Sequence, residues 1–420
     1  MLDRRFIREN PGAVRSAALA KGVALDVDEL LRLDQAVRSL QGEVDEGQRR
    51  RRELAREFSR ADDGRRSELR QRSEAIAERT RRNREELQIA ESRLTDLLLR
   101  TPGIPWEGAP VGPDESANVV IDTWGERPRL DFEPLDHVEL AERRGWVEFV
   151  RARQVAGERA YALAGDLALL ERALHSYALD ELTARGFRVI SVPALVREGA
   201  LIGSGFLPSG REEIYHLPED DLFLAGTAEA ALVGLHAGEV LALDRLPLLY
   251  AGISPCFRRE AGSAGRDVRG LLRVHQFEKV EQFVICRADQ EESARWHAGL
   301  LATARELLVA LGLHHQVVEC STGDMGLGKF RMNDINTWFP SLGTFRETHS
   351  CSTLHDWQAR RAGIRYRAED GAARFAHTLN NTAVATPRLL AALIENHQTR
   401  DGGVTLPEVL RPYMGGRDAI

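Results

Sequence analysis

The chain has 420 residues and a hydrophobic fraction of 43%, enough to bury a large core in two or three domains. Its formal charge of -7 excludes binding to nucleic acid through overall positive charge, so a nucleic-acid partner would need a local basic surface. The four cysteines are widely spaced, and we find neither a signal-like N-terminus nor an apolar run of membrane-spanning length. We therefore expect a cytoplasmic protein with no membrane partner.

Two long helices are predicted at residues 27–60 and 65–98, because these segments lack proline and repeat apolar residues every three to four positions. The letters ADDGR between them predict a turn, so the helices should form an antiparallel hairpin roughly 50 Å long. The apolar seam thins across residues 45–54, where most side chains are charged. We expect this part to form the tip of the arm and to bind a partner there.

A linker rich in proline and glycine at residues 101–118 separates the arm from the rest of the chain. We therefore predict an N-terminal domain at 1–103, with the hairpin at about 27–98, and a second domain at 104–420. In the second domain a helix is predicted at 167–186, ended by Gly186 and followed by a strand that contains Pro193. Proline within a strand favours a sheet edge or a dimer contact.

The segment 257–281, FRREAGSAGRDVRGLLRVHQFEKVE, carries unusual charge for a strand pair. Upstream of its glycine-rich loop, Arg258 and Glu260 should share one face of a strand. Downstream, alternation places a second polar set on one strand face: Arg273, His275, Phe277, Lys279 and Glu281. A guanidinium suits a phosphate, a carboxylate suits an amine, and a phenyl ring can stack on a base. The residues alone leave two alternatives open, a ligand site and a salt-bridged sheet face.

This segment resembles motif 2 of the class II aminoacyl-tRNA synthetases, in the form found in seryl-tRNA synthetases. GTAEAALVGLHAGEVL resembles the family's serine-binding segment, SCSTLHDWQARRAGIRYR another of its signatures, and HTLNNTAVATPRLLAALIENHQ its motif 3. The predicted hairpin resembles the family's tRNA-binding arm. The resemblance covers essentially the whole chain and implies an α+β fold: a mixed, mostly antiparallel sheet flanked by helices, with an N-terminal antiparallel helical coiled-coil arm. It also implies a homodimer.

The resemblance further implies how ATP and magnesium are held. Arg258 would hold the α-phosphate, Glu260 and Phe277 the adenine, and Arg388 the γ-phosphate, which makes Arg258, Glu260 and Arg388 the expected catalytic residues. The remaining expected ATP contacts are Arg259, Val274, Glu347, Thr348, His349 and Ser350. Glu347 and Ser350 would also hold Mg²⁺, which prefers oxygen ligands.

For serine, the resemblance implies Glu229 and Glu281 as partners of the ammonium and hydroxyl groups. If the letters GTAEA were extended, Thr227 and Glu229 would share a face, although this pattern alone is weak. The other expected serine contacts are Arg258, Asn380 and Thr382. A site that hydrogen-bonds a hydroxyl should reject alanine strongly, whereas threonine must be excluded by size.

Some residues depart from the common family pattern or have a second interpretation. His349, Cys351 and His355 have a spacing that could suggest zinc, but a fourth ligand is not evident and we expect no zinc. Thr348 and His349 stand where the family usually has a small or apolar residue followed by serine. No role is assigned to His275 or Lys279.

The reaction implied is ATP-dependent activation of L-serine to seryl-adenylate and transfer to the 3′ end of tRNA(Ser), with the selenocysteine tRNA as a further candidate. Residues 31–100 hold 18 arginines and 15 acidic residues, a net charge of +3, so we expect tRNA contact at the cluster Arg49, Arg50, Arg51 and Arg52 rather than along the whole arm. Arg266 and Arg269 in the motif 2 loop would meet the acceptor end. Two alternatives remain open: a specialised paralogue, for self-protection or seryl-adenylate supply, and an inactive RNA-binding relative.

Overall fold

The computed structural model describes residues 1–261 and 270–420. The chain divides into two compact units. One comprises Leu2–Leu19 and Val23–Pro102, and the other comprises Met1, Ala20–Gly22 and Gly103–Ile420. Within the described residues, no helix is both long enough and apolar enough to cross a membrane.

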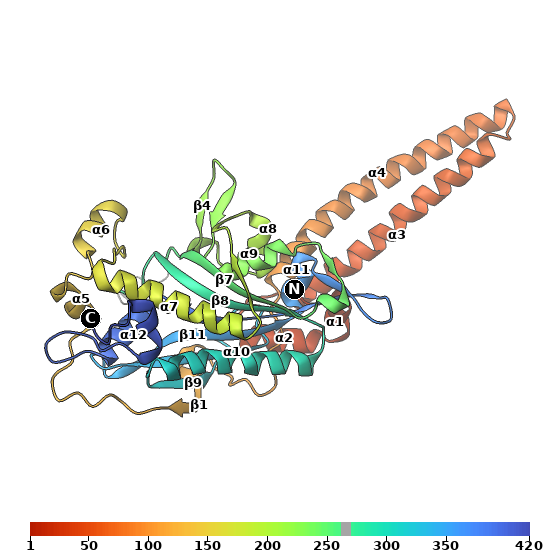
Figure 1. The fold of residues 1–420 in the computed structure, drawn as a ribbon. Helices are drawn as coiled ribbons and strands as arrows, with labels where there is room; N and C mark the ends of the chain where they lie inside the picture. Colours follow the sequence, from red (N-terminus) through yellow and green to blue (C-terminus); the bar gives the residue numbers. More distant parts are fainter. Residues whose placement is uncertain (262–269) are drawn as a thin grey trace. The chain divides into compact units, whose positions relative to one another are not determined.

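The first unit is helical. Its helices are α1 (Arg4–Glu9), α2 (Pro11–Ala20), α3 (Val27–Phe58) and α4 (Asp63–Arg100). The two long helices α3 and α4 run side by side as the expected hairpin (Figure 1). The side chains of Asp26 and Asp62 cap them by accepting hydrogen bonds from backbone N–H groups of the first turns, at 2.8 and 2.9 Å. These aspartates explain why each helix begins where it does.

The seam between α3 and α4 thins where the sequence predicted it. The helices approach closely at Gly47, where an added Cβ would lie 2.2 Å from the Thr80 hydroxyl oxygen. From there to Leu54, which is buried again, every residue of α3 is exposed. The cluster Arg49–Arg52 lies in this stretch, but α3 continues to Phe58, roughly 10 Å further on. The prediction that this cluster forms the tip is therefore wrong, because the helix extends past it.

The second unit is built on one large sheet. Its strand order is β1-β9-β10-β11-β14-β8-β7-β2, and every pair is antiparallel except β2 with β7. In chain order the strands are β1 (Val119–Trp124), β2 (Arg188–Ser191), β7 (Leu248–Phe257), β8 (Gln276–Cys286), β9 (His315–Glu319), β10 (Arg331–Phe339), β11 (Thr344–His355) and β14 (His377–Ala385). The mixed, mostly antiparallel sheet predicted from the sequence is confirmed.

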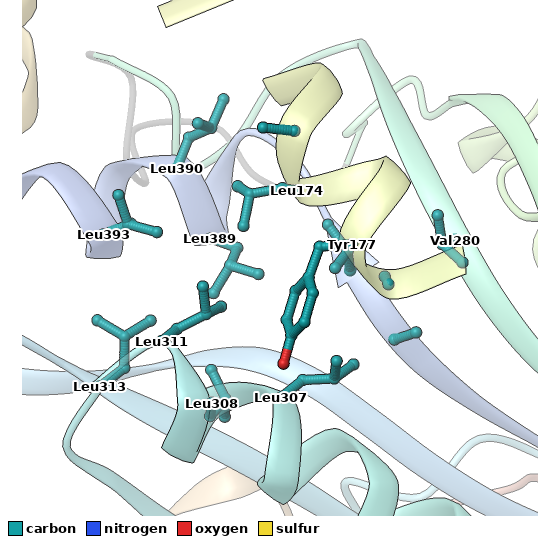
Figure 2. Packing of buried hydrophobic residues seen from close by; sticks show 14 of the residues in the cluster. Leu174, Tyr177, Val280, Leu307, Leu308, Leu311, Leu313, Leu389, Leu390 and Leu393 are labelled. Atoms are coloured by element: carbon teal, nitrogen blue, oxygen red, sulfur yellow. The ribbon is translucent and has the colours of Figure 1, made fainter. Parts of the chain in front are cut away.

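Helices cover both faces of this sheet. One face packs a leucine-rich core against α7 (Gly165–Ala184), α10 (Gln290–Ala310) and α12 (Arg388–Asn396), and Figure 2 shows Leu174, Leu308 and Leu389 from these helices around Tyr177 and Val280. The opposite face packs a second core against α8 (Glu198–Ser204), α9 (Ala228–Leu235) and α11 (Trp357–Ala362). Each face therefore has its own hydrophobic core.

The alternation of β8 decides which face carries the site. Val280 and Val284 belong to the first core, whereas Phe283 belongs to the second. Lys279 and Glu281 are four and two positions before Phe283 in the strand, so their side chains lie on the same face as Phe283. This is the face covered by α9 and α11. The predicted separation of charged from apolar side chains along this strand is therefore present.

Smaller elements complete the second unit. Two three-stranded sheets are formed by β3 (Leu195–Val196), β5 (Leu222–Leu224) and β4 (Tyr215–Leu217), and by β13 (Ala373–Phe375), β12 (Arg365–Arg367) and β6 (Val240–Leu241). Two further helices are α5 (His137–Arg143) and α6 (Phe149–Ala156). Short 3-10 turns lie at Glu115–Ala117, Arg211–Glu213, Leu243–Arg245 and Glu408–Met414.

The predicted strand around Pro193 needs a correction. The proline lies between β2, which ends at Ser191, and β3, which begins at Leu195, rather than inside one strand. It cannot donate the backbone hydrogen bond that a continuing strand needs, so the chain leaves the large sheet there. β2 is nevertheless the last strand of that sheet, so the expected sheet edge is confirmed.

Candidate active site

The β7–β8 hairpin supplies the floor of the site. Its last pair joins Phe257 to Gln276, and the next backbone bond runs from Arg258 N to His275 O at 3.0 Å. Arg258 therefore lies just beyond the end of β7, and β8 begins after His275. The guanidinium of Arg258 lies over the ring of Phe277, 5.3 Å from its centre. The Arg258 guanidinium and the Phe277 ring are therefore close together, and these are groups that can bind a phosphate and stack on a base.

Glu260 corrects the predicted strand geometry. The sequence placed Arg258 and Glu260 on one face of a strand, but the chain has left β7, and Glu260 has a φ of +54°. This left-handed backbone turns its carboxylate towards the segment that leads into β8, where Arg273 Nη1 donates to Oε2 at 2.8 Å. Arg273 likewise precedes β8 rather than belonging to it. Alternation fails here because neither residue has strand geometry.

A recess opens above this floor on the same side of the sheet. It brings together residues from motif 2, from β11 and from the start of α12 that lie up to 130 positions apart in the chain. The residues that line it are Arg258, Glu260, Leu271, Leu272, Arg273, Val274, Phe277, Lys279, Glu347, Thr348, Thr382, Ala385, Thr386, Pro387 and Arg388. Eight of the predicted ATP- and serine-binding residues therefore line one cavity.

Arg388 and Glu347 form an ion pair at one end of the recess. Arg388 is the first residue of α12; its Nη1 donates to Glu347 Oε2 at 3.0 Å, and its Nε donates to the carbonyl of Leu272 at 2.9 Å. The surrounding protein disfavours charge on Glu347, yet the charge and hydrogen bond of Arg388 hold the pKa of this carboxyl below its usual value. Glu347 keeps 47% of its side-chain surface exposed. An ionised carboxylate thus faces the recess next to two arginines.

The opposite end holds the predicted serine residues, and here the extended geometry assumed for GTAEA is wrong. Thr227 is the N-cap of α9, and its hydroxyl accepts from the backbone N–H of Glu229 at 3.3 Å, so Glu229 is already helical. The Lys279 ammonium donates to the same hydroxyl at 3.1 Å and forms an ion pair with Glu281. Lys279, to which the sequence assigned no role, therefore joins both predicted serine-binding elements.

Glu229 is held by two amides. Gln358 Nε2 and Asn380 Nδ2 donate to its Oε1 at 2.6 and 2.7 Å. Burial raises the pKa of Glu229, and repulsion from Glu281 raises it further. Gln358 lies in the quoted signature SCSTLHDWQARR, but nothing in its spacing reveals that it contacts a residue 129 positions away. Sequence reasoning missed it for that reason.

Motif 3 contributes to this end through β14. Thr382 is the cross-strand partner of Glu281, which places its hydroxyl beside the serine pocket. The register shifts between Thr382 and Val384, and the carbonyl of Ala383 in this bulge accepts from His349 Nε2 at 3.0 Å. His349 also contacts the Thr348 hydroxyl at 2.9 Å, so its two ring nitrogens are used within the protein.

Two groups of side chains could be considered as metal sites. The spacing of His349, Cys351 and His355 could suggest zinc, although we expected none; in the structure His349 bonds to β14 and His355 stacks on His377 with ring centres 4.6 Å apart. Cys320, Asp324 and Asp334 have ligand atoms within 4.8 Å of one another. Burial raises the pKa of the Cys320 thiol and raises that of Asp334 to about 7, with further repulsion from Glu347. Both shifts favour the protonated forms of the thiol and of Asp334, and a cation needs the deprotonated forms as ligands.

Ser350 offers a better oxygen ligand than either group. It pairs across the strands with Asp334, and among the described residues its buried hydroxyl oxygen has no hydrogen-bond partner of ordinary geometry. It lies on β11 three positions after Glu347. A buried hydroxyl on the strand that also carries an ionised carboxylate fits a hard cation such as Mg²⁺, which prefers oxygen ligands.

The remaining predicted residues are not brought into the recess. Arg259 donates its backbone N–H to Glu213 O at 2.9 Å, and its side chain does not line the cavity. Arg266 and Arg269 lie outside the described residues. Arg49–Arg52 belong to the other unit, where Arg49 and Arg50 both pair with Glu46.

Family comparisons agree with the sequence resemblance. A model described as the seryl-tRNA synthetase N-terminal domain matches residues 1–105, and one described as the tRNA synthetase class II core domain (G, H, P, S and T) matches residues 215–397. Serine–tRNA ligase of Deinococcus radiodurans is 52% identical over 420 residues, covering 100% of this chain and 99% of the relative. That of Rubrobacter xylanophilus is 42% identical, covering 99% and 98%.

Solved structures match over the same length. Seryl-tRNA synthetase of Pyrococcus horikoshii complexed with ATP has a TM-score of 0.92 and 39% identity, covering 100% of this chain and 99% of that one. The cytoplasmic enzyme of Naegleria fowleri in complex with AMP has a TM-score of 0.88 and 31% identity, covering 100% and 98%. Both structures therefore resemble the whole of the chain rather than one domain of it.

Proposed function

The chain belongs to the seryl-tRNA synthetase family, and we propose that it activates L-serine with ATP and transfers the serine to the 3′ end of tRNA(Ser) through the recess described above. The serine carboxylate attacks the α-phosphorus of ATP, pyrophosphate leaves, and seryl-adenylate forms. A ribose hydroxyl of the terminal nucleotide then attacks the serine carbonyl, and AMP leaves. Relatives that match over the full length favour this activity over the two alternatives raised from the sequence.

The observation that carries the proposal is the polarity of the recess. One end presents the guanidinium groups of Arg258 and Arg388. The other end is lined by Lys279 and Thr382, and Lys279 connects it to Glu281 by an ion pair and, through the Thr227 hydroxyl, to the helix that carries Glu229. An amino acid bound between them would turn its carboxylate to the arginines and its ammonium to the glutamates. This orientation places the attacking carboxylate next to the phosphates.

The serine pocket holds opposite charges close together. Glu229 and Glu281 would carry negative charge, Lys279 supplies a positive charge that pairs with Glu281, and Lys329 also attracts Glu229. A bound ammonium would add a direct positive partner for Glu229. We propose that Lys279 keeps the buried Glu281 paired when the site is empty and leaves Glu229 for the substrate.

Selectivity for serine would come from its hydroxyl. Glu281 and Thr382 are cross-strand partners, and both are buried, so they would exchange hydrogen bonds with a serine hydroxyl in a place that excludes water. Alanine would leave these polar groups unpaired, which costs far more than the loss of one contact. Asn380 would contact the bound serine and also donate a hydrogen bond to Glu229.

At the ATP end, the proposed roles follow the geometry. Phe277 would stack on adenine with Glu260 at its edge, and Arg258 would stabilise charge that builds on the α-phosphate. Arg388 would reach the γ-phosphate. We also propose that ATP is contacted by Val274, Thr348, His349 and Arg259.

Glu347 and Ser350 would hold Mg²⁺. The carboxylate is ionised beside Arg388, and the hydroxyl of Ser350 has no other partner of ordinary geometry among the described residues, so both fit an oxygen-liganded ion. When bound, the ion supplies charge neutralisation on the phosphate oxygens. The arginines orient the same phosphates from the protein side.

The arm would select the tRNA. We propose that Arg49–Arg52 contact the backbone of the tRNA and that Arg266 and Arg269 meet the acceptor end. A transcript lacking the long variable arm tests the first contact. We also propose that the domain boundary lies between residues 103 and 104, that the protein forms a homodimer and that it is cytoplasmic.

Serine-dependent exchange of labelled pyrophosphate into ATP tests the activation step. We expect exchange with L-serine and at least about a hundredfold less with alanine, because alanine leaves the hydroxyl partners unpaired. Threonine should also exchange less than serine. Equal exchange with alanine, or none with serine, would contradict the proposed substrate.

A further inference from the structure

The backbone of residues 270–273 is held by side chains from three other parts of the second unit. Arg388 Nε donates to the carbonyl of Leu272 at 2.9 Å, and Arg159 Nη1 donates to the carbonyl of Arg273 at 3.2 Å. The backbone N–H of Leu271 donates to His137 Nε2 at 3.2 Å. The first contact comes from a residue that lines the recess, whereas the third leads to a buried imidazole.

The hydrogen bonds of His137 determine which nitrogen carries the proton. A backbone N–H can only donate, so Nε2 must be the unprotonated acceptor for Leu271. Nδ1 therefore carries the proton and donates to Glu395 Oε1 at 2.8 Å. The backbone N–H of His137 donates to the same oxygen at 3.0 Å. The imidazole thus connects the Glu395 carboxylate to the backbone of Leu271.

Glu395 is fully buried and has a second set of partners. Its Oε2 accepts from the backbone N–H of Ser341 at 3.2 Å and from the Ser341 hydroxyl at 2.7 Å. Four donors therefore fix the carboxylate, and one of them orients His137. A buried carboxylate with this many partners does not move without breaking several bonds.

Glu395 and Arg388 belong to the same helix. They are seven residues apart in α12, which is two turns, so both lie on one face. Arg388 holds Leu272 directly, and Glu395 holds Leu271 through His137. Two successive residues of the chain are thus fixed against the helix that supplies the proposed γ-phosphate ligand.

The imidazole also limits which residue can precede Leu271. Gly270 has a φ of +89°, and an added Cβ would lie 2.5 Å from His137 Nε2 and 2.6 Å from a methyl group of Val138. Leu271 itself is fully buried among Phe339, Ala391 and Ala392. The ring and the backbone therefore fit closely, with no space for a side chain between them.

We propose that His137 and Glu395 are positioning residues for ATP. They hold the backbone of 270–273, and through it the Leu272 carbonyl that orients Arg388 and the Arg273 side chain that contacts Glu260. This inference rests on the proposed ATP roles of Arg388 and Glu260. Neither His137 nor Glu395 lines the recess, so neither touches the substrate.

Two substitutions of His137 separate its hydrogen bond to Leu271 from its hydrogen bond to Glu395. In His137→Asn, the shorter amide can still donate to Glu395 but has no acceptor that reaches Leu271. In His137→Gln, the longer side chain can place a carbonyl oxygen near the position of Nε2. The backbone N–H of His137 and both Ser341 donors remain on Glu395 in each variant.

The test measures the affinity of each full-length variant for a non-hydrolysable ATP analogue by calorimetry, and KM for ATP and serine in pyrophosphate exchange. We expect His137→Asn to weaken analogue binding and raise KM for ATP about tenfold, because a buried N–H loses its acceptor. KM for serine should stay within about twofold, and His137→Gln should restore ATP affinity to within about threefold of wild type. Thermal unfolding of both variants is measured in parallel.

The inference is overturned if both variants bind the analogue like wild type, or if KM rises by the same factor for ATP and serine. If His137→Asn does not fold, His137→Gln decides alone: analogue affinity near that of wild type supports the acceptor role, and a large loss contradicts it. Analogue binding needs no amino acid, so this result is independent of serine-dependent exchange by the wild-type protein. Failure of the proposed substrate and failure of the positioning role are therefore distinguishable.

Discussion

In the serine pocket, Lys279 and Glu281 keep 8% and 2% of their side-chain surface exposed, whereas Arg49 and Arg50 on the arm keep 66% and 63%. The pocket holds each charge against fixed partners, such as the Thr227 hydroxyl. The arm holds its charges on a helix surface in water. Both regions are proposed to bind a charged ligand, but they use charge in different environments.

This difference determines how each region should respond to change. A buried charge that loses its partner is poorly solvated, so one substitution can abolish the function of the site. Exposed charges are screened by salt and act on a polyanion together, so each one contributes a small share. Single substitutions should therefore have large effects in the recess and small effects on the arm.

The largest effect is expected for Arg258→Ala. It removes the guanidinium proposed to stabilise charge on the α-phosphate, so the rate of pyrophosphate exchange should fall by about 10³-fold or more. Arg287→Ala is a suitable control, because Arg287 follows the other end of β8, does not line the recess and keeps about half of its side chain exposed while pairing with the buried Glu292. Near-normal exchange by Arg258→Ala would refute the phosphate role.

A somewhat smaller effect is expected for Lys279→Arg, although charge is conserved. Only three of the 57 basic residues are lysines, and this one donates to Thr227 and pairs with Glu281 in a space that suits a compact ammonium. We expect kcat/KM for serine to fall by about a hundredfold with KM for ATP nearly unchanged. Gln276→Arg, on an exposed position of the same strand, controls for added bulk. An equal loss for ATP and serine would mean that Lys279 only supports the fold.

Acidification should weaken serine binding more than ATP binding. The pKa of Glu229 is raised by burial and by Glu281, so it binds a proton at a higher pH than an ordinary glutamate, for which the pKa is about 4.3. Lys279, Lys329 and the amide of Gln358 act in the opposite direction. Below the raised pKa the carboxyl is neutral and attracts the serine ammonium less, so KM for serine should rise as pH falls. A KM for serine that is constant down to the ordinary glutamate range would contradict this.

The smallest effect is expected on the arm. Among the described residues, Arg51 has no hydrogen bond or ion pair, so Arg51→Ala should not disturb the helix. We expect about a two- to threefold loss in kcat/KM for tRNA and a shallower salt dependence, with exchange unchanged. Glu46→Gln should act in the opposite direction, because Glu46 pairs with Arg49 and Arg50. Loss of exchange in either variant would break the distinction between the two regions.

The long helices and the alternation of β8 could be predicted because their signals are local. The caps Asp26 and Asp62 and the apolar repeats determine the helices, and each end lies within about two residues of its prediction. Lys279 and Glu281 were expected on one face because a strand has a period of two. The sequence could not reveal that Thr227 caps a helix or that Glu260 has a positive φ, since both depend on the chain leaving regular structure.

The supporting contacts of the site could not be predicted, because they join distant segments. Gln358 reaches Glu229, and His137 reaches Glu395, across 129 and 258 positions. Neither residue has a local pattern that distinguishes it from an ordinary buried polar side chain. Family resemblance identified residues expected to touch the ligands, whereas the structure identified those that orient them.

The most direct test of the account compares exchange and tRNA charging in a variant that lacks residues 31–98. If the buried site activates serine and the arm selects tRNA, serine-dependent exchange should remain within about threefold of wild type while charging falls by at least about a hundredfold. Circular dichroism and thermal unfolding establish that the shortened chain is folded. Loss of both activities by the same factor in a folded variant would contradict the separation of tasks.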